Sequence, residues 1–382
     1  MEGFNLQTNL AVDTRTERVS SKKYAAAEFF AGVGLVRLGL EQADIDVVFA
    51  TDIDNTKFKS YAANFGSEDF HLADVRNISG ADIPNIQVAT ASFPCTDLSL
   101  AGKRAGLKGE HSGMFWEFAR VIDEMGSRKP STLLLENVPG FASSREGKDL
   151  HDAIERLNGL GYSCDLLVVD AKHFVPQSRQ RLFIVASQVK PSSIGDWEPS
   201  NVRPAWIKEF VNRFPQLDMA PAKLSPLQQA DVSFDDVAER LSHNNKAWWN
   251  EERLTKFVES LSPLHKTRLE QKIKASQLSW ATAYRRTRNG NAIWEIRPDN
   301  IAGCLRTPRG GSSKQAVVEA GRGKVRVRWM TAKEYASLQG APDFKLHAVT
   351  ETQAKFAMGD AVCVPAISWI MREYTSLVEL EK

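Results

Sequence analysis

The stretch "EFFAGVGLVRLGL", residues 28–40, joins the end of an apolar segment to two glycines and the start of an amphipathic segment. Gly32 and Gly34 allow the backbone to turn sharply and to bring its amide groups close to a ligand at the start of a helix. The next apolar segment ends in "FATDID", which places Asp52 where a carboxylate accepts both hydroxyls of a ribose. Arg37 stands where a dinucleotide-binding motif has its third glycine. The pattern therefore favours an adenosine cofactor without a pyrophosphate, and a structural turn followed by a solvated acid is the alternative.

Six short apolar segments occur between residues 24 and 186 and alternate with helix-like stretches. Such segments are typical of strands buried on both faces of a sheet, and the alternation predicts a doubly wound parallel α/β domain. Strands are expected at residues 24–30, 46–50, 86–91, 132–136, 165–170 and 181–186.

Three helices have recognisable ends. One is expected between Ser112 and Gly126, with Phe115, Phe118, Ile122 and Met125 on its apolar face. Thr331 and Glu334 form a capping-box pair for a second helix, which Gly340 ends. Pro365 stands near the first turn of a third.

Length and charge limit the class of protein. The chain has 382 residues, enough for more than one domain, and a net charge of only +2, so any surface for nucleic acid must be local. The cysteines form no Cys-x-x-Cys pair, which argues against a disulfide framework and a structural zinc site. The polar N-terminal sequence and the absence of a long apolar run favour a cytoplasmic protein with no membrane segment.

The strand and helix alternation stops near residue 190, where prolines, indoles and mixed polar residues become frequent. We expect the smaller second domain to be irregular. The expected parts are a polar tail (1–23), a catalytic cofactor-binding domain (24–190), a second domain (191–324) and a C-terminal segment returning to the catalytic domain (325–382).

Cys95 follows the third expected strand, "IQVATA" (residues 86–91), at the carboxyl edge of the predicted sheet, where ligands bind in α/β folds. A basic, glycine-rich loop comes after it and includes Lys103 and Arg104, which suits closure over an anionic substrate. The thiol is usable as a nucleophile if its neighbours favour the thiolate, and inert packing is the alternative.

Glu136 ends the next apolar segment at the same edge. The leucines directly before it in the sequence predict that the Glu136 carboxyl is partly desolvated, which would raise its pKa and suit it as a general acid. Capping of the following turn is the alternative. Arg179 and Arg181 stand two apart on an extended segment, so their side chains and that of Gln177 are expected to face one site. An exposed basic strand edge is the alternative.

A local basic region lies between Arg285 and Arg328, where eleven Lys and Arg residues oppose three acids. This excess suits contact with phosphates, and a solvated basic face is the alternative. The tryptophans in "KAWWN", residues 246–250, are expected to be core packing rather than a platform for bases.

The stretches "FFAGVG", "ASFPCTDLS", "LLLENV", "QSRQR", "RTPRGG" and "MGDAV", in this order, resemble the motifs of the DNA (cytosine-5)-methyltransferases over roughly residues 24–190 and 300–370. The resemblance implies a Rossmann-like methyltransferase domain and a smaller DNA-recognition domain. It implies S-adenosyl-L-methionine as cofactor, no metal, and a flipped-out cytosine in a short sequence of double-stranded DNA as substrate. A restriction-modification methylase would act as a monomer, with a cognate restriction endonuclease as a separate partner.

By similarity, Cys95 attacks carbon 6 of the cytosine, Glu136 holds or protonates ring nitrogen 3, Arg181 holds the carbonyl oxygen and Arg179 steadies the site. The implied cofactor residues are Phe30, Gly32, Gly34, Asp52 (ribose), Ile53 (adenine face), Asp74 (adenine amino group), Asp360 and Val362. The expected DNA contacts are Ser99, Lys103, Arg104, Arg285, Arg286, Arg288, Arg306 and Arg309.

Two positions depart from the family pattern. Thr96 stands after Cys95 where the family usually has Gln, which leaves the thiol in place. Asp360 stands where the family favours Asn, and its negative charge is expected to weaken cofactor binding or to alter cofactor choice.

Three other functions remain open at this point. An RNA cytosine-5 methyltransferase shares these motifs, although the large middle segment favours DNA. A catalytically silent DNA-binding protein of the same fold is opposed by the intact Cys95, Glu136 and Arg181. A nicotinamide-linked oxidoreductase is opposed by the incomplete glycine motif.

Overall fold

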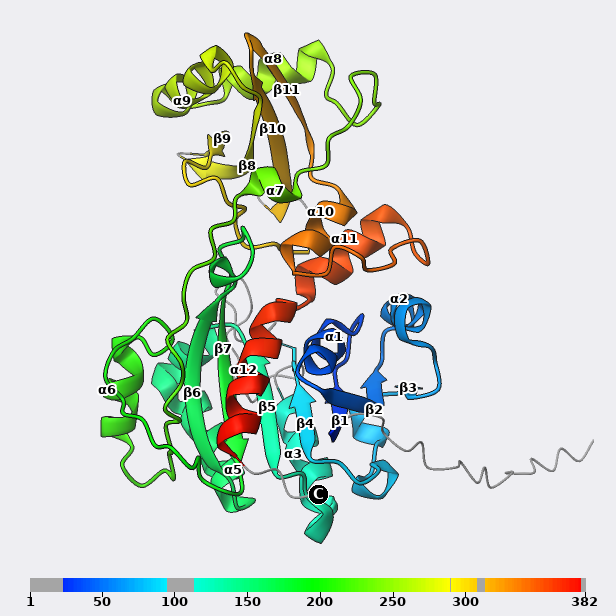
Figure 1. Ribbon diagram of the computed structural model, residues 1–382, viewed down its shortest axis with the longest axis vertical. Helices are drawn as coiled ribbons and strands as arrows, with labels where there is room; N and C mark the ends of the chain where they lie inside the picture. The colour runs from blue at the N-terminus through cyan, green and yellow to red at the C-terminus, as the bar shows by residue number, and fades with distance from the viewer. Residues whose placement is uncertain (1–22, 95–112, 289, 308–312, 379–382) are drawn as a thin grey trace, which may run out of the picture.

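The computed structural model describes residues 23–94, 113–288, 290–307 and 313–378, which form two β-sheets joined through helices (Figure 1). The larger sheet has seven strands in the order β3-β2-β1-β4-β5-β7-β6. They are β1 (Tyr24–Phe29), β2 (Ile45–Asp52), β3 (Phe70–Leu72), β4 (Val88–Ala91), β5 (Thr132–Asn137), β6 (Ser163–Asp170) and β7 (Gln180–Ser187). All six expected strands form. The sequence analysis missed β3, because three residues are too few for a recognisable apolar pattern.

The direction of β7 corrects the expectation of a wholly parallel sheet. β1 pairs parallel with β2 and β4, as do β2 with β3 and β4 with β5, whereas β7 pairs antiparallel with both β5 and β6. The reason is the short connection at residues 171–179, since a parallel crossover needs about a dozen residues or more. As a result, the amino end of β7 lies at the same edge as the carboxyl end of β5.

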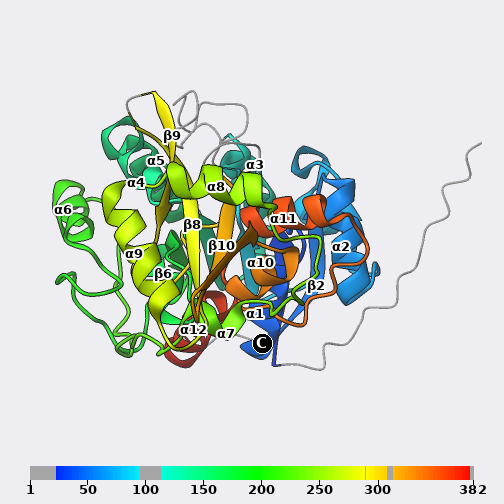
Figure 2. The same cartoon turned by 90° about the horizontal axis from the view of Figure 1, so that it is seen from above.

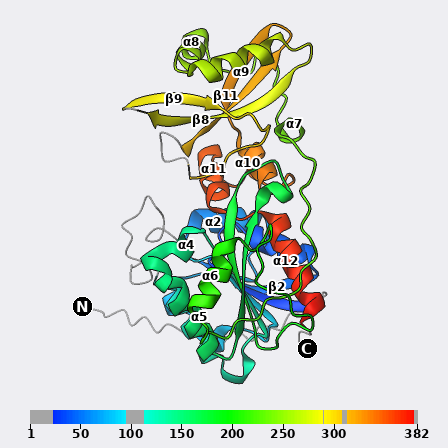
Figure 3. The same ribbon diagram turned by 90° about the vertical axis from the view of Figure 1, so that its left-hand side faces the viewer.

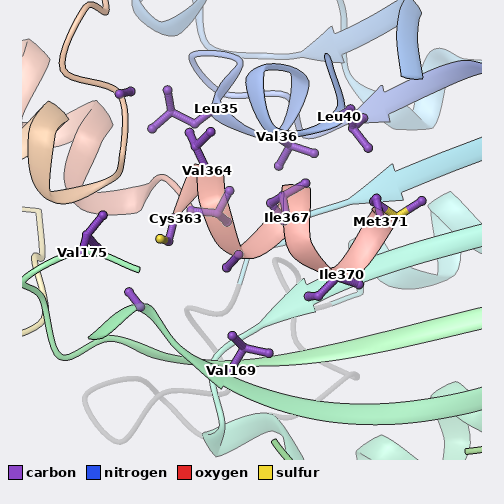
Figure 4. Close-up of a cluster of buried hydrophobic side chains, with 14 of the residues drawn as sticks. Leu35, Val36, Leu40, Val169, Val175, Cys363, Val364, Ile367, Ile370 and Met371 are labelled. Carbon is purple, nitrogen blue, oxygen red and sulfur yellow. The ribbon is translucent and has the colours of Figure 1, made fainter. Parts of the chain in front are cut away.

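Helices cover both faces of the larger sheet. On one face, α1 (Leu35–Gln42) packs against α12 (Val364–Leu377), and Figure 4 shows the apolar side chains of the two helices facing each other. Gly39 permits this close approach, because a Cβ there would lie 2.6 Å from the Cβ of Ile367. The apolar core of the opposite face includes residues of α3 (Met114–Glu124), α4 (Gly140–Ser143), α5 (Lys148–Gly159) and α6 (Ala205–Arg213). Beside β2 and β3, α2 (Asn55–Phe65) contacts both strands.

The smaller unit is a four-stranded antiparallel sheet, which corrects the expectation of an irregular domain. Its strands, in the order β11-β10-β8-β9, are β8 (Ser279–Arg288), β9 (Asn291–Ile296), β10 (Gln315–Gly321) and β11 (Lys324–Trp329). Helices α8 (Glu251–Glu259) and α9 (Pro263–Lys274) cover it, and α7 (Phe234–Val237), α10 (Ala332–Leu338) and α11 (Glu351–Asp360) lie between the two sheets (Figures 1 and 3). Trp249 packs in its core with ring centroids 5.7 Å from Trp294 and 5.1 Å from Trp329. This confirms the expected packing role for that tryptophan.

The boundaries of the two units differ from the expected residues 190 and 324. Residues 191–222 stay with the larger sheet, where the amide of Ala220 donates to the carbonyl of Cys164 over 2.9 Å. At the other boundary, β11 belongs entirely to the smaller sheet although it begins at Lys324. The expected tail, residues 1–23, lies outside the described residues except for its last residue.

The expected helix ends are confirmed where the chain is described. Thr331 and Glu334 make both bonds of a capping box, Gly340 follows α10 with a φ of 78°, and Pro365 lies in the first turn of α12. Ser112 lies outside the described residues. Contrary to expectation, residues 351–377 contain an 18-residue window that is apolar enough to span a membrane by composition, but 67% of that window is buried inside the protein, as in the core helix of a soluble protein.

A buried carboxylate ties α12 and the 191–222 segment to β6. Asp165 is 1% exposed and accepts hydrogen bonds from the Arg203 guanidinium, from the amide of Ala222 at 2.8 Å and from the Tyr374 hydroxyl. Arg203 is buried as well, so each charge depends on the other for compensation.

We expect Asp165→Ala to lower the free energy of unfolding by about 3–5 kcal/mol, because it leaves the Arg203 charge buried without its partner. Tyr374→Phe is the milder variant and is expected to cost about 1 kcal/mol for one hydrogen bond. Urea unfolding followed by circular dichroism measures both, and equal losses in the two variants would contradict a dominant role for the ion pair.

Candidate functional site

The carboxyl edge of the larger sheet holds the glycine loop after β1 and the acid that ends β2. Asp52 accepts the amide of Gly32 at 2.8 Å through one oxygen and the amide of Asp54 at 2.9 Å through the other. Each carboxylate oxygen has a second lone pair, so Asp52 still has capacity to accept two hydroxyl groups. The loop is open above Gly32, where an added Cβ would meet only the Phe30 carbonyl oxygen at 4.0 Å.

Packing and backbone conformation account for three other residues in and after the glycine loop, namely Phe30, Gly34 and Arg37. A Cβ at Gly34 would lie 2.4 Å from the ring of Phe65, so packing of α1 on α2 requires this glycine. Phe30 is half-buried and has a left-handed φ of 57°, a strained conformation of a kind common at ligand sites. Arg37 is buried and donates to the Tyr61 hydroxyl at 2.9 Å. The position that lacks the third glycine is therefore occupied by a packing residue.

Two exposed apolar side chains lie at neighbouring strand ends beside this loop. Ile53 follows β2 and is 67% exposed, while Leu72 ends β3 and is 47% exposed. Asp52 is the register partner of Leu72, which makes Ile53 and Leu72 neighbours at the edge. Exposed apolar surface of this kind suits a flat ring. The sequence analysis identified Ile53 but missed Leu72, because it missed β3.

Asp74 lies after β3 and already has a charged partner. It accepts two hydrogen bonds at 3.0 Å from Nε of Arg76, which lower the pKa of its carboxyl, and its side chain is 16% exposed. It lies at the same edge as Asp52, as expected.

The chain returns to this edge at the end of α11. Asp360 is 53% exposed at its side chain, and its carboxylate lies 3.8 Å from the Lys57 ammonium of α2. The extra negative charge noted in the sequence thus has a positive partner, which the sequence analysis missed because the two residues are 303 positions apart (360 minus 57). Val362 is buried.

The second half of the site is an ion pair between β5 and β7. Nε of Arg181 lies 2.9 Å from the Glu136 carboxylate, and the two side chains are only 15% and 11% exposed. Burial raises the pKa of Glu136, and the nearby charges of Arg181 and Arg179 oppose that rise without cancelling it. The raised pKa is in the direction expected from the leucine-rich strand.

The chain that leads to Cys95 is held beside Glu136. The Asn137 amide donates to the Phe93 carbonyl at 3.3 Å, and Ser92 hydrogen-bonds with the Glu136 side chain. Cys95 itself lies outside the described residues, as does Thr96, but its neighbour Pro94 is described and exposed. The sequence analysis missed the contribution of Ser92.

Arg179 does not share the exposure of Arg181. It is 1% exposed, and its guanidinium donates to the carbonyl of Leu305 at 2.8 Å and to those of Gly359 and Ala361. Gln177 is fully buried and accepts the Leu305 amide at 3.0 Å. The alternative of an exposed basic strand edge is therefore wrong for these two residues, which fix the backbone around the site.

The expected DNA contacts that the structure describes lie on β8 of the smaller sheet and on the segment after β9. Arg286 is exposed and stands 3.3 Å from the Glu295 carboxylate, Arg285 is half-buried and Arg306 is exposed. Arg288 is described only as part of the backbone of β8. Outside the described residues lie Ser99, Lys103, Arg104 and Arg309.

Ion pairs reduce the positive charge that this surface presents. Each of the three acids between residues 285 and 328 has an arginine within 4 Å: Arg286–Glu295, Arg297–Asp299 and Arg326–Glu319. Arg328 is fully buried against Glu334. The count from sequence therefore overstates the basic surface.

The sequence of the chain is similar to those of known methyltransferases. The family model described as C-5 cytosine-specific DNA methylase matches residues 24–376. The type II methyltransferase M1.ScrFI of Lactococcus lactis subsp. cremoris is 25% identical over 96% of this chain and 82% of its own length. For M.HpaII of Haemophilus parainfluenzae the identity is 28%, over 91% of this chain and 87% of its own.

Solved structures share the fold at lower sequence identity. The Dnmt2 methyltransferase of S. pombe superimposes with a TM-score of 0.60 at 17% identity, covering 93% of this chain and 99% of its own. A putative DNA modification methyltransferase encoded within an E. coli prophage gives a TM-score of 0.57 at 17% identity, covering 93% and 99%.

A buried carboxyl under the glycine loop predicts a pH dependence of stability. Glu28 is 1% exposed, accepts the Arg37 amide at 3.3 Å through one oxygen, and has no hydrogen-bond partner for the other among the described residues. Burial, with a smaller contribution from Asp52, raises its pKa from 4.5 to about 8 against the opposing charge of Arg37.

The folded protein therefore keeps this proton up to about pH 8, whereas the unfolded chain releases it near pH 4.5. The contribution of Glu28 to stability is greatest below the lower value and falls as the pH rises towards the upper one. We expect Glu28→Gln to remove this part of the pH slope, so that the variant loses less stability between pH 5 and pH 8 than the wild type. Urea unfolding across that range measures it, with the exposed Glu155→Gln as control; parallel slopes in wild type and Glu28→Gln would contradict the assignment.

Proposed function

The chain belongs to the C-5 cytosine-specific DNA methylase family, and from that premise we propose how its residues carry out the reaction. It is a DNA (cytosine-5)-methyltransferase, an enzyme that methylates carbon 5 of cytosine in DNA. The proposal adds that the cytosine is flipped out of a specific short duplex sequence and reacts through a covalent adduct with Cys95. The observation that supports it most directly is the Arg181–Glu136 pair beside the chain that leads to Cys95.

The edge around Asp52 fits S-adenosyl-L-methionine. Asp52 would hold the ribose hydroxyls, Ile53 and Leu72 would contact the adenine, and the open side of Gly32 would admit the ligand. Phe30, Gly34, Asp74, Asp360 and Val362 complete the proposed cofactor surface. When bound there, S-adenosyl-L-methionine supplies the methyl group that carbon 5 receives.

The protein's own groups make carbon 5 reactive. The Cys95 thiolate adds to carbon 6 of the ring, and the electron pair of the double bond between carbons 5 and 6 becomes available at carbon 5. Protonated Glu136 donates to ring nitrogen 3, for which its raised pKa suits it, so that negative charge does not accumulate on the ring. Arg181 holds the carbonyl oxygen and keeps Glu136 in place. Solvent water then takes the proton from carbon 5, and the electron pair of that bond restores the double bond between carbons 5 and 6. Cys95 leaves carbon 6 as the thiolate, and the proton on ring nitrogen 3 returns to Glu136.

Recognition of the duplex is assigned to the smaller sheet. The hairpin of β8 and β9 extends over the side of the larger sheet where α3, α4 and α5 lie (Figures 2 and 3). Arg285, Arg286 and Arg306 are the described residues proposed to contact DNA, either at phosphates or at base edges. The proposed contacts Ser99, Lys103, Arg104, Arg288 and Arg309 would complete that surface.

We propose a biological setting by analogy with the relatives, which are named as type II methyltransferases. We assign the protein to a restriction-modification system, in which a cognate endonuclease acts separately on the same sequence. The enzyme is proposed to act as a cytoplasmic monomer, because one catalytic unit and one recognition unit suffice for one base.

We expect Cys95→Ser to reduce methyl transfer by at least about a thousandfold, because a hydroxyl is a far weaker nucleophile than a thiolate at neutral pH. Incorporation of tritium from labelled S-adenosyl-L-methionine into genomic DNA measures the rate, and bisulfite sequencing identifies the methylated sequence. DNA containing 5-fluorocytosine should form a stable adduct with the wild type and none with Cys95→Ser. The buried Cys164→Ser serves as control.

Two results would contradict the proposal. Full methylation by Cys95→Ser would remove the nucleophile assignment, and incorporation into RNA alone would change the substrate.

We expect Asp360→Asn to lower the KM for S-adenosyl-L-methionine about two- to fivefold, because it frees the Lys57 ammonium for the carboxylate of the cofactor, within the range of an exposed ion pair. Lys57→Met should change the KM in the opposite direction, and Lys59→Met on the same helix is the control. An unchanged KM in both Asp360→Asn and Lys57→Met would place the pair outside the cofactor surface.

A further inference from the structure

A second thiol lies in the site beside the two arginines. Sγ of Cys304 stands 3.5 Å from a terminal nitrogen of Arg179 and 3.4 Å from the carbonyl oxygen of Leu305, and it also hydrogen-bonds with the Arg181 side chain. Cys304 lies between β9 and β10, far in sequence from Cys95, and the proposed mechanism gives it no part.

The charges around Cys304 distinguish it from the other described cysteines. Burial alone would raise its pKa, as it does for Cys164 and for Cys363, whose pKa is raised to about 12. At Cys304 the positive charges of Arg179, Arg181 and Arg306 outweigh burial and lower the pKa. The lowered pKa favours the thiolate, which accepts hydrogen bonds from guanidinium groups more strongly than a neutral thiol does.

The backbone around Cys304 is fixed on both sides. The amide of Gly303 donates to the Gln315 side chain at 3.0 Å, and the amide of Leu305 donates to the Gln177 side chain at 3.0 Å. Arg179 is anchored by the Leu305 carbonyl. Arg181 has a long side chain that loses rotamer freedom when it is ordered, so a fixed acceptor next to it restricts its orientation.

We propose that Cys304 is a positioning residue that holds the Arg181 guanidinium in the orientation in which its Nε meets Glu136. This inference rests on the proposed function, in which Arg181 and Glu136 contact the cytosine. The thiol acts through Arg181 and does not touch the base.

The first test is single-turnover methyl transfer by Cys304→Ala and Cys304→Ser. We expect Cys304→Ala to slow the step about tenfold while the Kd values for DNA and cofactor stay within about twofold, since the lost interaction serves orientation rather than binding. Cys304→Ser keeps a hydrogen-bonding group and should recover most of the rate. Cys363→Ser, at a buried cysteine not in this contact, is the matched control.

The pH profile separates positioning from general loss of stability. The charged groups that act on the thiol are Arg179, Arg181 and Arg306, and Glu136 is paired with Arg181. We expect Cys304→Ala to change the pH dependence of the single-turnover rate, whereas a variant that is only less stable keeps the wild-type profile. A rate within about twofold of wild type with the same profile would overturn the proposal.

A second measurement does not depend on methyl transfer. Alkylation of Cys304 by iodoacetamide, followed by mass spectrometry, reports the thiolate population as a function of pH. We expect Arg181→Met to shift this profile to higher pH, and an unchanged profile would overturn the contact between the two side chains. If the wild type transfers no methyl group to DNA, the proposed function fails, and the alkylation result still decides whether Cys304 and Arg181 are coupled.

Discussion

The buried guanidinium of Arg179 is the constraint on which the site depends. It lies directly before β7 and connects that segment to Leu305 and to the end of α11, three segments far apart in the sequence. A buried charge is tolerated only when hydrogen bonds replace its hydration, and here backbone carbonyls provide them. Gln177 and Gln339 extend the same framework with buried bonds to Leu338 and Met358. The packing is close, because a Cβ on Gly359 would lie 2.5 Å from the Arg306 carbonyl carbon.

The antiparallel direction of β7 brings Arg181 next to Glu136. In a wholly parallel sheet, the amino end of β7 would lie opposite the carboxyl end of β5, and Arg181 would be remote from Glu136. Antiparallel pairing instead puts both at one edge, where burial raises the pKa of the carboxyl and the arginine limits the rise. The raised pKa favours proton donation by Glu136, and Arg181 keeps the carboxyl oriented.

The two parts of the site at this edge of the sheet differ in how much of them the sequence predicted. The proposed cofactor surface around Asp52 depends on short-range features: a glycine loop, the acid at the end of the next strand and an exposed Ile53 directly after it. The proposed cytosine-binding part consists of residues 92, 136, 181 and 304, whose proximity depends on strand order and direction. The basic region shows the same limit, because a count of charges does not reveal that three of its acids pair with three of its arginines.

Apolar periodicity and capping residues were sufficient for six strands of the larger sheet and for the ends of α10 and α12, because those signals act within a few residues of one another. The ordered motifs were likewise sufficient to indicate the family and its chemistry. Tertiary structure decided the direction of β7, the sheet of the smaller unit, and the partners of Asp360, Arg179 and Cys304. These features arise from contacts between segments more than a hundred residues apart or from competition among alternative strand pairings, and neither leaves a local pattern in the chain.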